Sequence, residues 1–439
     1  MDRSFIERGP LLSWECWNDI CPTIRTIRIC LRPSRLCADL LVKNRRHRDL
    51  LLRTNLMHTP LRPSNEELPH NGAARDGFSV RMVNDLIKDL GEPRPWIYWT
   101  DLLVSWSIGY AAFLVFVNST SWAWKFPTLI VAGLAFYRCS MFIHELQHLR
   151  EGTFRAFKTV WNLLCGIPFL IPQFTYGDHR GHHVNREYGT ADDAEYLMIV
   201  QKPIASAIYM ITRIFWLPPV FFFRFLVLTP LTWLHAAIRR WVWKYPSRGP
   251  AVNLVRNHYV PNSREEPYWR MQEAGCFIYL AGLTTLLVTG LVPWTFLLDI
   301  YVLSVFMITV SHMRTITSHR FRNDGSEMTY LEQLFDSTTI PGHPILTELW
   351  CPIGLRWHAL HHISQTLPYH NLGIAHRRLM AALPPGTLYH ATIRNGLFHA
   401  LYDVARTIWR TNRRMRIVQA RQRLSSVAAP GESQTAVLN

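Results

Sequence analysis

Apolar residues are concentrated in four long runs along this chain, at residues 102–117, 126–142, 274–292 and 294–310. Each run comes close to the roughly 20 apolar residues that a helix needs to cross a membrane, once its flanking aromatic residues are counted. The runs form two pairs, joined by residues 118–125 in the first pair and by little more than Pro293 in the second. The pattern therefore predicts an all-α integral membrane protein with four transmembrane helices in two hairpins.

Two further apolar stretches, 157–176 and 204–238, are interrupted by residues that a membrane span tolerates poorly. The first contains two prolines, and the second contains Arg213, Arg224 and a pair of prolines. A charge at mid-bilayer costs roughly 2.5–3.5 kcal/mol on insertion scales, and a proline inside a helix costs about 3 kcal/mol. We therefore expect both stretches to lie in the membrane interface or to re-enter it. A paired double crossing within 204–238 would have the same net effect on the topology.

The distribution of charge orients these hairpins. The chain carries 47 Lys and Arg against 31 Asp and Glu, a net charge of +16. The connectors within the hairpins hold a single Lys, whereas the opposite ends carry Arg-rich segments. The positive-inside rule then predicts that both termini lie in the cytosol. Basic residues that flank apolar runs indicate anionic lipid head groups or an acidic partner protein rather than nucleic acid.

The sequence divides into three parts. Residues 1–95 are rich in Arg, Pro and Asn without a sustained period, so they predict a basic and poorly ordered cytosolic extension. Residues 96–380 hold the apolar runs and form the predicted membrane domain. Residues 381–439 form a basic cytosolic segment, which we expect to be disordered after about residue 422.

Eight of the 20 histidines fall into three clusters whose spacing places the imidazoles on one side of a helix. The clusters are His144-Glu-Leu-Gln-His148, His179-Arg-Gly-His182-His183 and His358-Ala-Leu-His361-His362. Because one zinc ion takes at most about four protein ligands, eight histidines predict two metal ions that share one site. With four spans, all three clusters face the cytosol and can meet there.

The residues near the clusters add further candidates. His312 and His319 follow the fourth apolar run and lie seven residues apart, which is two turns along one helical face. We expect His319, further from the membrane, to be a ninth ligand, and His312 to be a weaker candidate. Glu145 and Asp178 lie next to clustered histidines, so they are candidates for carboxylates that orient a ligand imidazole.

The first cluster also reads His144-Glu145-x-x-His148, the motif of zinc peptidases, in which Glu145 would act as general base. A peptidase site needs only one more ligand and would leave most of the other clustered histidines without a role. A membrane zinc metalloprotease is therefore a remote alternative.

The three histidine boxes, their order and their placement around two hairpins resemble the membrane fatty acid desaturase superfamily over roughly residues 102–380. This superfamily also includes hydroxylases and ketolases. The resemblance implies a cytosolic helical di-iron domain, two iron ions that cycle between Fe²⁺ and Fe³⁺, and O₂ as co-substrate. The family's extra ligand would fall on His319. Stearoyl-CoA desaturases place an Asn one turn before that histidine, where this chain has Thr315.

The resemblance implies oxygen-dependent desaturation of a fatty acyl chain, linked to a lipid or held as a thioester. Hydroxylation or ketolation of a lipid, a terpenoid or carotenoid, or an alkyl substrate is the alternative, because the same ligands serve both outcomes. No haem-binding His-Pro-Gly-Gly segment or iron–sulfur cysteine pattern occurs. We therefore expect a separate electron donor of the ferredoxin, rubredoxin or cytochrome type. We also expect the protein to lie in a bacterial inner membrane, with its active site in the cytosol.

Overall fold

The computed structural model describes residues 78–184, 186–245, 247 and 259–428. Within these ranges the chain is helical and holds no strand, only isolated bridges of His319 with Ser337 and of Thr339 with Ile393. The α-helices of the first half are α2 (Val80–Ile87), α3 (Pro95–Asn118), α4 (Trp122–His148), α5 (Arg155–Trp161), α6 (His179–His182), α7 (Pro203–Phe223), α8 (Thr229–Leu234) and α9 (Ala236–Lys244). Those of the second half are α10 (Glu266–Val288), α11 (Thr295–Ser318), α12 (Tyr330–Asp336), α13 (Pro344–Trp350), α14 (His358–Ile363), α15 (Tyr369–Ala382), α16 (Leu388–Ala391) and α17 (Leu397–Ala428). The predicted all-α class is confirmed.

Five helical segments of the described chain are long and apolar enough to cross a membrane. Four are α3, α4, α10 and α11, which contain the four predicted runs. The fifth, Pro203–Leu234, covers most of the stretch that we expected at the interface. It continues as helix through both prolines and joins α7 to α8 by a π-helical turn at Arg224–Leu228. The stretch 157–176 forms only short helical turns.

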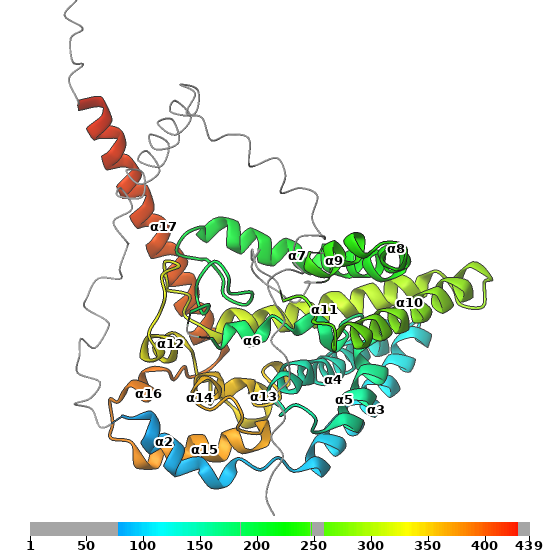
Figure 1. Ribbon diagram of the computed structural model, residues 1–439, viewed down its shortest axis with the longest axis horizontal. Helices are drawn as coiled ribbons and strands as arrows, with labels where there is room; N and C mark the ends of the chain where they lie inside the picture. Colours follow the sequence, from blue (N-terminus) through cyan, green and yellow to red (C-terminus); the bar gives the residue numbers. More distant parts are fainter. Residues whose placement is uncertain (1–77, 185, 246, 248–258, 429–439) are drawn as a thin grey trace, which may run out of the picture. The chain divides into compact units, whose positions relative to one another are not determined.

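Glycines let α4 pack closely against α3 and α11, and ion pairs of Arg138 with Asp101 and of Lys125 with Asp299 join the same helices. A Cβ atom at Gly109 of α3 would come within 2.5 Å of the Phe136 ring of α4, and one at Gly133 of α4 would come within 2.2 Å of the Phe306 ring of α11. Glycine at these positions therefore allows the close helix approach that is common within membranes. This packing sets α4 beside both α3 and α11 (Figure 1).

The chain after α7 is fixed against the first half of α10. The buried Arg224 guanidinium forms an ion pair with Glu273 of α10, and it also donates to Ser247 Oγ at 2.9 Å and to Thr229 Oγ1 at 2.8 Å. Earlier in α7, the Phe215 carbonyl accepts a hydrogen bond of 3.2 Å from the Tyr301 hydroxyl of α11. The segment from α7 to α8 therefore lies alongside α10 and α11 (Figure 1).

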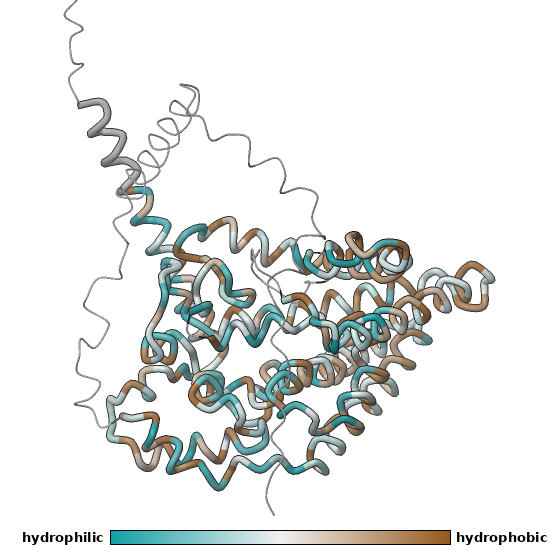
Figure 2. Tube along the Cα trace, viewed as in Figure 1, coloured by the Kyte–Doolittle hydropathy of each residue, from teal (hydrophilic) through white to brown (hydrophobic). Residues whose placement is uncertain are grey.

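Exposed apolar side chains lie on the outer faces of these long helices, where Figure 2 shows hydrophobic positions along the tube. Examples are Val104 on α3, Ile211 on α7, and Ile278 and Val288 on α10, each at least half exposed. Surfaces of this kind are expected where lipid rather than water surrounds the protein.

Helices α2, α12 and α16 form a second core around α14 and α15. Val83 and Ile87 of α2 are buried there with Leu360 and Leu379, and the Ser79 hydroxyl caps α2. Residues 78–95 of the predicted extension therefore belong to the packed structure. Residues 1–77 and 429–439 lie outside the described residues, so the expectation of disorder at either end stays a prediction there, and α17 is helical up to Ala428.

Candidate metal centre

All nine predicted histidine ligands converge on one region, each of them buried or half-buried. His144 and His148 occupy the last two turns of α4, and His319 directly follows α11. The second cluster forms the single turn α6 with His183 at its end, and the third cluster lies on α14. A Cβ atom at Gly181 in α6 would come within 2.2 Å of the Glu187 carboxylate, so a larger residue there would make the end of that flexible side chain move.

The histidines separate into two groups, within each of which the ligating nitrogens all lie within 4.8 Å of one another. The five-histidine group consists of His144, His148, His179, His183 and His361. The four-histidine group consists of His182, His319, His358 and His362. Each group draws residues from at least three separate elements of the chain, so the fold, and not a single motif, builds both sites.

The nitrogen spacing fits a metal ion in each group. Neighbouring Nε2 atoms lie 2.8 Å apart in His148 and His179, 3.1 Å apart in His148 and His361, and 3.2 Å apart in His182 and His319. Ligand bonds of about 2.1 Å that meet at right angles would place neighbouring nitrogens roughly 3.0 Å apart. Both ring nitrogens of the buried His144 lack a hydrogen-bond partner, which is costly unless one of them binds a cation.

Carboxylates from the loop after α6 orient two of the ligands. The Nδ1–H group of His182 donates to the Asp193 carboxylate at 2.9 Å, and that of His179 donates to Glu195 at 2.6 Å. Such bonds fix the ring so that the Nε2 lone pair faces the metal position. Sequence reasoning missed both carboxylates, which follow the second cluster at no helical spacing.

His319 is oriented by a tyrosine. Its Nδ1 atom lies 2.8 Å from the Tyr188 hydroxyl, which donates to Asp336 at 3.2 Å. A ring whose Nδ1 carries the proton again leaves Nε2 free to bind a metal ion. The orienting groups of both sites thus come from the segment after α6 and from the end of α12.

Electrostatics keeps most of these imidazoles neutral, the form that binds metal. Burial, together with the neighbouring imidazoles, lowers the pKa of His361 to about 3 and holds the pKa values of His319, His358 and His362 well below their usual range. Burial opposes protonation of His182 as well, but the Asp193 charge outweighs it and raises its pKa.

Three other predicted site residues, Glu145, His312 and Asp178, lie outside the two histidine groups. The Glu145 carboxylate accepts hydrogen bonds from the Tyr98 hydroxyl and the Tyr369 backbone N–H, and its orienting role beside a ligand stays a prediction. His312 lies outside both histidine groups of the described chain. The two-turn argument fails because His319 itself is extended (φ −132°, ψ 163°) and no longer shares the face of α11. Asp178 accepts a hydrogen bond from the Tyr259 backbone N–H at 2.8 Å, and its role beside a ligand stays a prediction.

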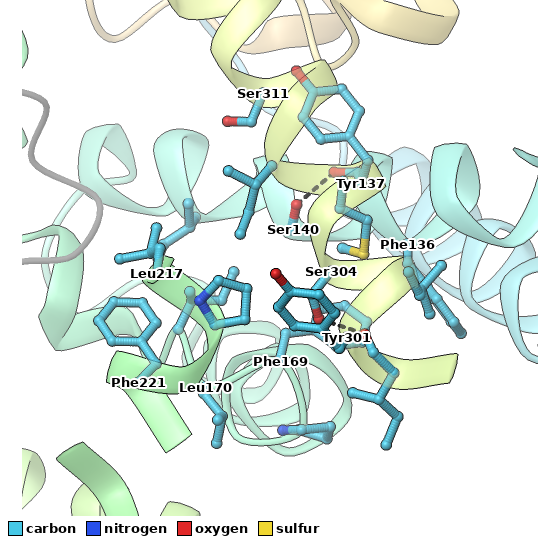
Figure 3. Close-up of a pocket in the computed structure, with 18 of the residues that line it drawn as sticks. Phe136, Tyr137, Ser140, Phe169, Leu170, Leu217, Phe221, Tyr301, Ser304 and Ser311 are labelled. Atoms are coloured by element: carbon cyan, nitrogen blue, oxygen red, sulfur yellow. Dashed lines mark hydrogen bonds between the residues drawn. The ribbon is translucent and has the colours of Figure 1, made fainter. Parts of the chain in front are cut away.

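A mainly apolar cavity of about 640 Å³ lies between α4, α7 and α11 and reaches the five-histidine group at His144. Figure 3 shows Tyr137 and Ser140 of α4, Leu217 and Phe221 of α7, and Tyr301, Ser304 and Ser311 of α11 around it. Phe113 and Phe296, whose rings contact each other, also line it, and Phe296 lies in the first turn of α11, at the other end of that helix from His319. The cavity has the size and lining of a site for an alkyl chain.

A model of the fatty acid desaturase family matches residues 120–393, a range that contains all nine histidines. The chain belongs to this family. It is also 34% identical over 346 residues to a protein named ceramide hydroxylase from Caulobacter vibrioides (strain NA1000 / CB15N), across 77% of this chain and 96% of that protein. No solved structure matches the chain.

Family membership makes the protein an oxidoreductase of the fatty acid desaturase type, embedded in a membrane and acting on lipid. Members of the family use a di-iron centre, and the two histidine groups are able to bind metal. The zinc peptidase alternative is not favoured, because five histidines surround the position that a peptidase would give to three ligands, and Glu145 points to tyrosine partners.

Proposed function

We propose that this protein uses two iron ions and O₂ to oxidise an unactivated C–H bond in the alkyl chain of a membrane lipid. The observation that carries the proposal is the position of His144, which belongs to the five-histidine group and also lines the apolar cavity. A chain bound in that cavity would bring one of its carbons next to the metal position. The other side chains that line the cavity are not able to oxidise an alkyl chain.

The five-histidine group would hold one iron, and the four-histidine group would hold the other. Imidazole nitrogens suit iron. When bound and reduced, such an iron pair would activate O₂ for the oxidation of an alkyl C–H bond. The protein itself orients the ligands through Asp193, Glu195 and Tyr188, and the apolar cavity excludes water from the reacting carbon.

Hydroxylation and desaturation are both within reach of such a site. The similarity to a protein named ceramide hydroxylase supports hydroxylation of a lipid with an amide-linked chain, and it extends over 96% of that protein. Desaturation of an acyl chain, the activity after which the family is named, is the second candidate. The two differ only in the fate of the carbon after the first hydrogen is removed.

We further propose that α3, α4, α10 and α11 cross the membrane and that the segment from α7 to α9 makes no net crossing. His182 precedes α7 and His319 follows α11, yet their Nε2 atoms lie 3.2 Å apart. Three crossings between them would put them on opposite faces of the membrane. This distance supports the predicted four-span topology. We place the metal centre and both termini on the cytosolic side of a bacterial inner membrane, because the basic residues flank the ends of the hairpins away from their short connectors.

Electrons would come from a separate acidic donor of the ferredoxin, rubredoxin or cytochrome type. The net charge of +16 supports docking of such a partner, although attraction to anionic lipid would require the same charge.

Lipid profiling tests the proposal. A host that expresses the wild-type chain is compared with one that expresses His361→Ala, which lacks one ligand of the five-histidine group. A new lipid that is heavier by one oxygen, present only with the wild type, would establish hydroxylation. One that is lighter by two hydrogens would establish desaturation. Identical lipids in both hosts, with the protein present and iron-loaded, would count against the proposed function.

A further inference from the structure

The cavity contains a buried arginine that has no ion pair with any residue in the described part of the chain. On α7, Met210, Arg213, Leu217 and Phe221 form one buried face, and three of the four side chains are apolar, as a face packed on other membrane helices should be. Arg213 is only 2% exposed and lines the cavity. Its Nε and Nη1 atoms have no hydrogen-bond partner among the residues that the structure describes.

The same helical run shows how this protein satisfies a buried charge when the charge is structural. Arg224 pairs with Glu273 and donates to Ser247 and Thr229. Arg213 has no ion pair with any described residue, and its guanidinium carbon lies 5.9 Å from the centre of the Tyr209 ring, a cation–π contact at the outer limit of the usual range. An ionisable side chain inside a membrane protein is costly unless paired, so its partner is expected to be a ligand.

His312 supplies the complementary group on α11. Its Nδ1–H donates to the Ile308 carbonyl at 2.8 Å within the helix, which leaves Nε2 as an acceptor. That Nε2 atom is buried and has no partner, and His312 lines the same cavity as Arg213. The cavity wall therefore carries donors of Arg213 and an acceptor of His312 that no described residue uses. Its other charged side chains, Glu195 and Arg314, attract each other, and both lie near the metal centre, where His144 also lines the cavity. Most of the remaining wall is apolar.

We propose that Arg213 and His312 bind the polar head group of the lipid substrate. Arg213 would donate to a carbonyl or hydroxyl oxygen, and His312 Nε2 would accept from a hydroxyl. The head group must then carry both an acceptor and a donor, as an N-acylated amino alcohol does. A free fatty acid carboxylate or a simple ester or thioester would satisfy Arg213 but would leave His312 without a partner.

The position of Arg213 and His312 relative to the metal centre affects which carbon of a bound lipid is oxidised. His312 precedes His319 by seven residues, which is about 10 Å along the chain at the helical rise of 1.5 Å per residue. A head group bound there is held at a fixed distance from the metal centre. Arg213 and His312 would thereby decide which carbon of the chain reaches His144, as positioning residues and not as catalytic ones.

The inference rests on the proposed function, and binding measured apart from turnover separates the two. Full-length protein in lipid nanodiscs is titrated with a fluorescent short-chain ceramide, with its O-methylated form that lacks the free hydroxyls, and with a fluorescent fatty acid. Arg213→Met should weaken ceramide binding about 10- to 100-fold, the range for a lost hydrogen bond to a charged group. Arg213→Lys should restore part of it.

His312→Phe removes the acceptor, and His312→Gln retains one. O-methylation should weaken binding to the wild type by about as much as His312→Phe does, and should have little additional effect on His312→Phe itself. Arg240→Met removes the same charge from an exposed position on α9 that does not line the cavity. That control should bind ceramide like the wild type.

Thermal unfolding tests whether Arg213 has only a structural role. Arg213→Met removes an unpaired buried charge, so its Tm should equal or exceed that of the wild type. A lower Tm with unchanged ceramide binding would overturn the proposal, and so would fatty acid binding as tight as ceramide binding. If the wild type binds ceramide as described but changes no lipid in the host, the head-group site stands and the proposed function fails.

Discussion

The carboxylate of Asp193 holds the Nδ1–H group of His182 between its two oxygens, at 2.9 Å and 3.0 Å. Asp193 is itself fixed, because the backbone N–H groups of Gly189 and Glu195 donate to it at 2.8 Å and 2.9 Å. Both side chains are fully buried. A short irregular loop thereby sets the orientation of a ligand in the four-histidine group.

Asp193→Asn should weaken metal binding about 10- to 100-fold, the usual effect of losing a partner that orients a ligand. The amide keeps the shape of the side chain, but it lacks the charge that stabilises the donating imidazole. Iron content after dialysis against a graded series of chelator concentrations measures the change. Asp192→Asn makes the same charge change one residue away and should keep wild-type iron content. Equal iron retention in Asp193→Asn and wild type would show that this hydrogen bond does not support the metal.

His182→Ala and His361→Ala remove one ligand each from different groups. Each should abolish turnover while the protein stays embedded in the membrane, because both metal positions are needed for the oxidation. His235→Asn serves as the control, since His235 caps α9 far from both groups in the sequence and Asn is also able to cap a helix. Product analysis in the lipid extract and iron content of the purified variants provide the measurements. Full activity in either alanine variant would contradict a shared di-iron site.

Helical spacing made the histidines predictable, because i, i+3 and i, i+4 neighbours share a face whatever the rest of the fold does. The same reasoning failed for His312, since α11 ends at Ser318 and His319 is extended. Asp193, Glu195 and Tyr188 escaped prediction because their loop has no period. Their contacts depend on how that loop folds back over α6, which only the tertiary structure reveals.

The long apolar segment around α7 was harder to interpret for a different reason. Sequence rules penalise Arg213, Arg224 and the two prolines as if each faced lipid. The structure pairs Arg224 with Glu273 and accommodates both prolines within the helix that leads to a π-helical turn. The penalties therefore apply to an isolated helix and overestimate the cost in a packed one.

Two truncations should separate the described core from the segment before it. Deletion of residues 2–77 leaves Phe78 and the Ser79 cap of α2 in place, so turnover in membranes should be largely retained. Deletion of residues 2–90 removes Val83 and Ile87 from the core around α14, and each lost core side chain typically costs about 1–3 kcal/mol. That variant should show reduced expression and lose activity. Equal activity of the two truncations, measured per amount of membrane-bound protein, would mean that α2 does not support the metal centre.

From the cavity we predict that activity depends on the length of the lipid's alkyl chain, and one substitution tests this dependence. Ser304 lies on the cavity wall (Figure 3), and along α11 it stands between Phe296, near the start of the helix, and His312, in the half that leads to His319. Ser304→Phe should fill this part of the cavity, so oxidation of long-chain lipids should fall at least about tenfold, by the cost of overpacking, while short-chain analogues should still react.

Leu298→Phe places the same ring on α11 at a position that is 60% exposed and outside the cavity. This control should leave the ratio of long-chain to short-chain oxidation unchanged. Competition between long- and short-chain lipids in one vesicle preparation gives the ratio directly. If Ser304→Phe lowers both rates equally, the alkyl chain does not extend past Ser304, and the cavity beyond that residue has no part in substrate binding.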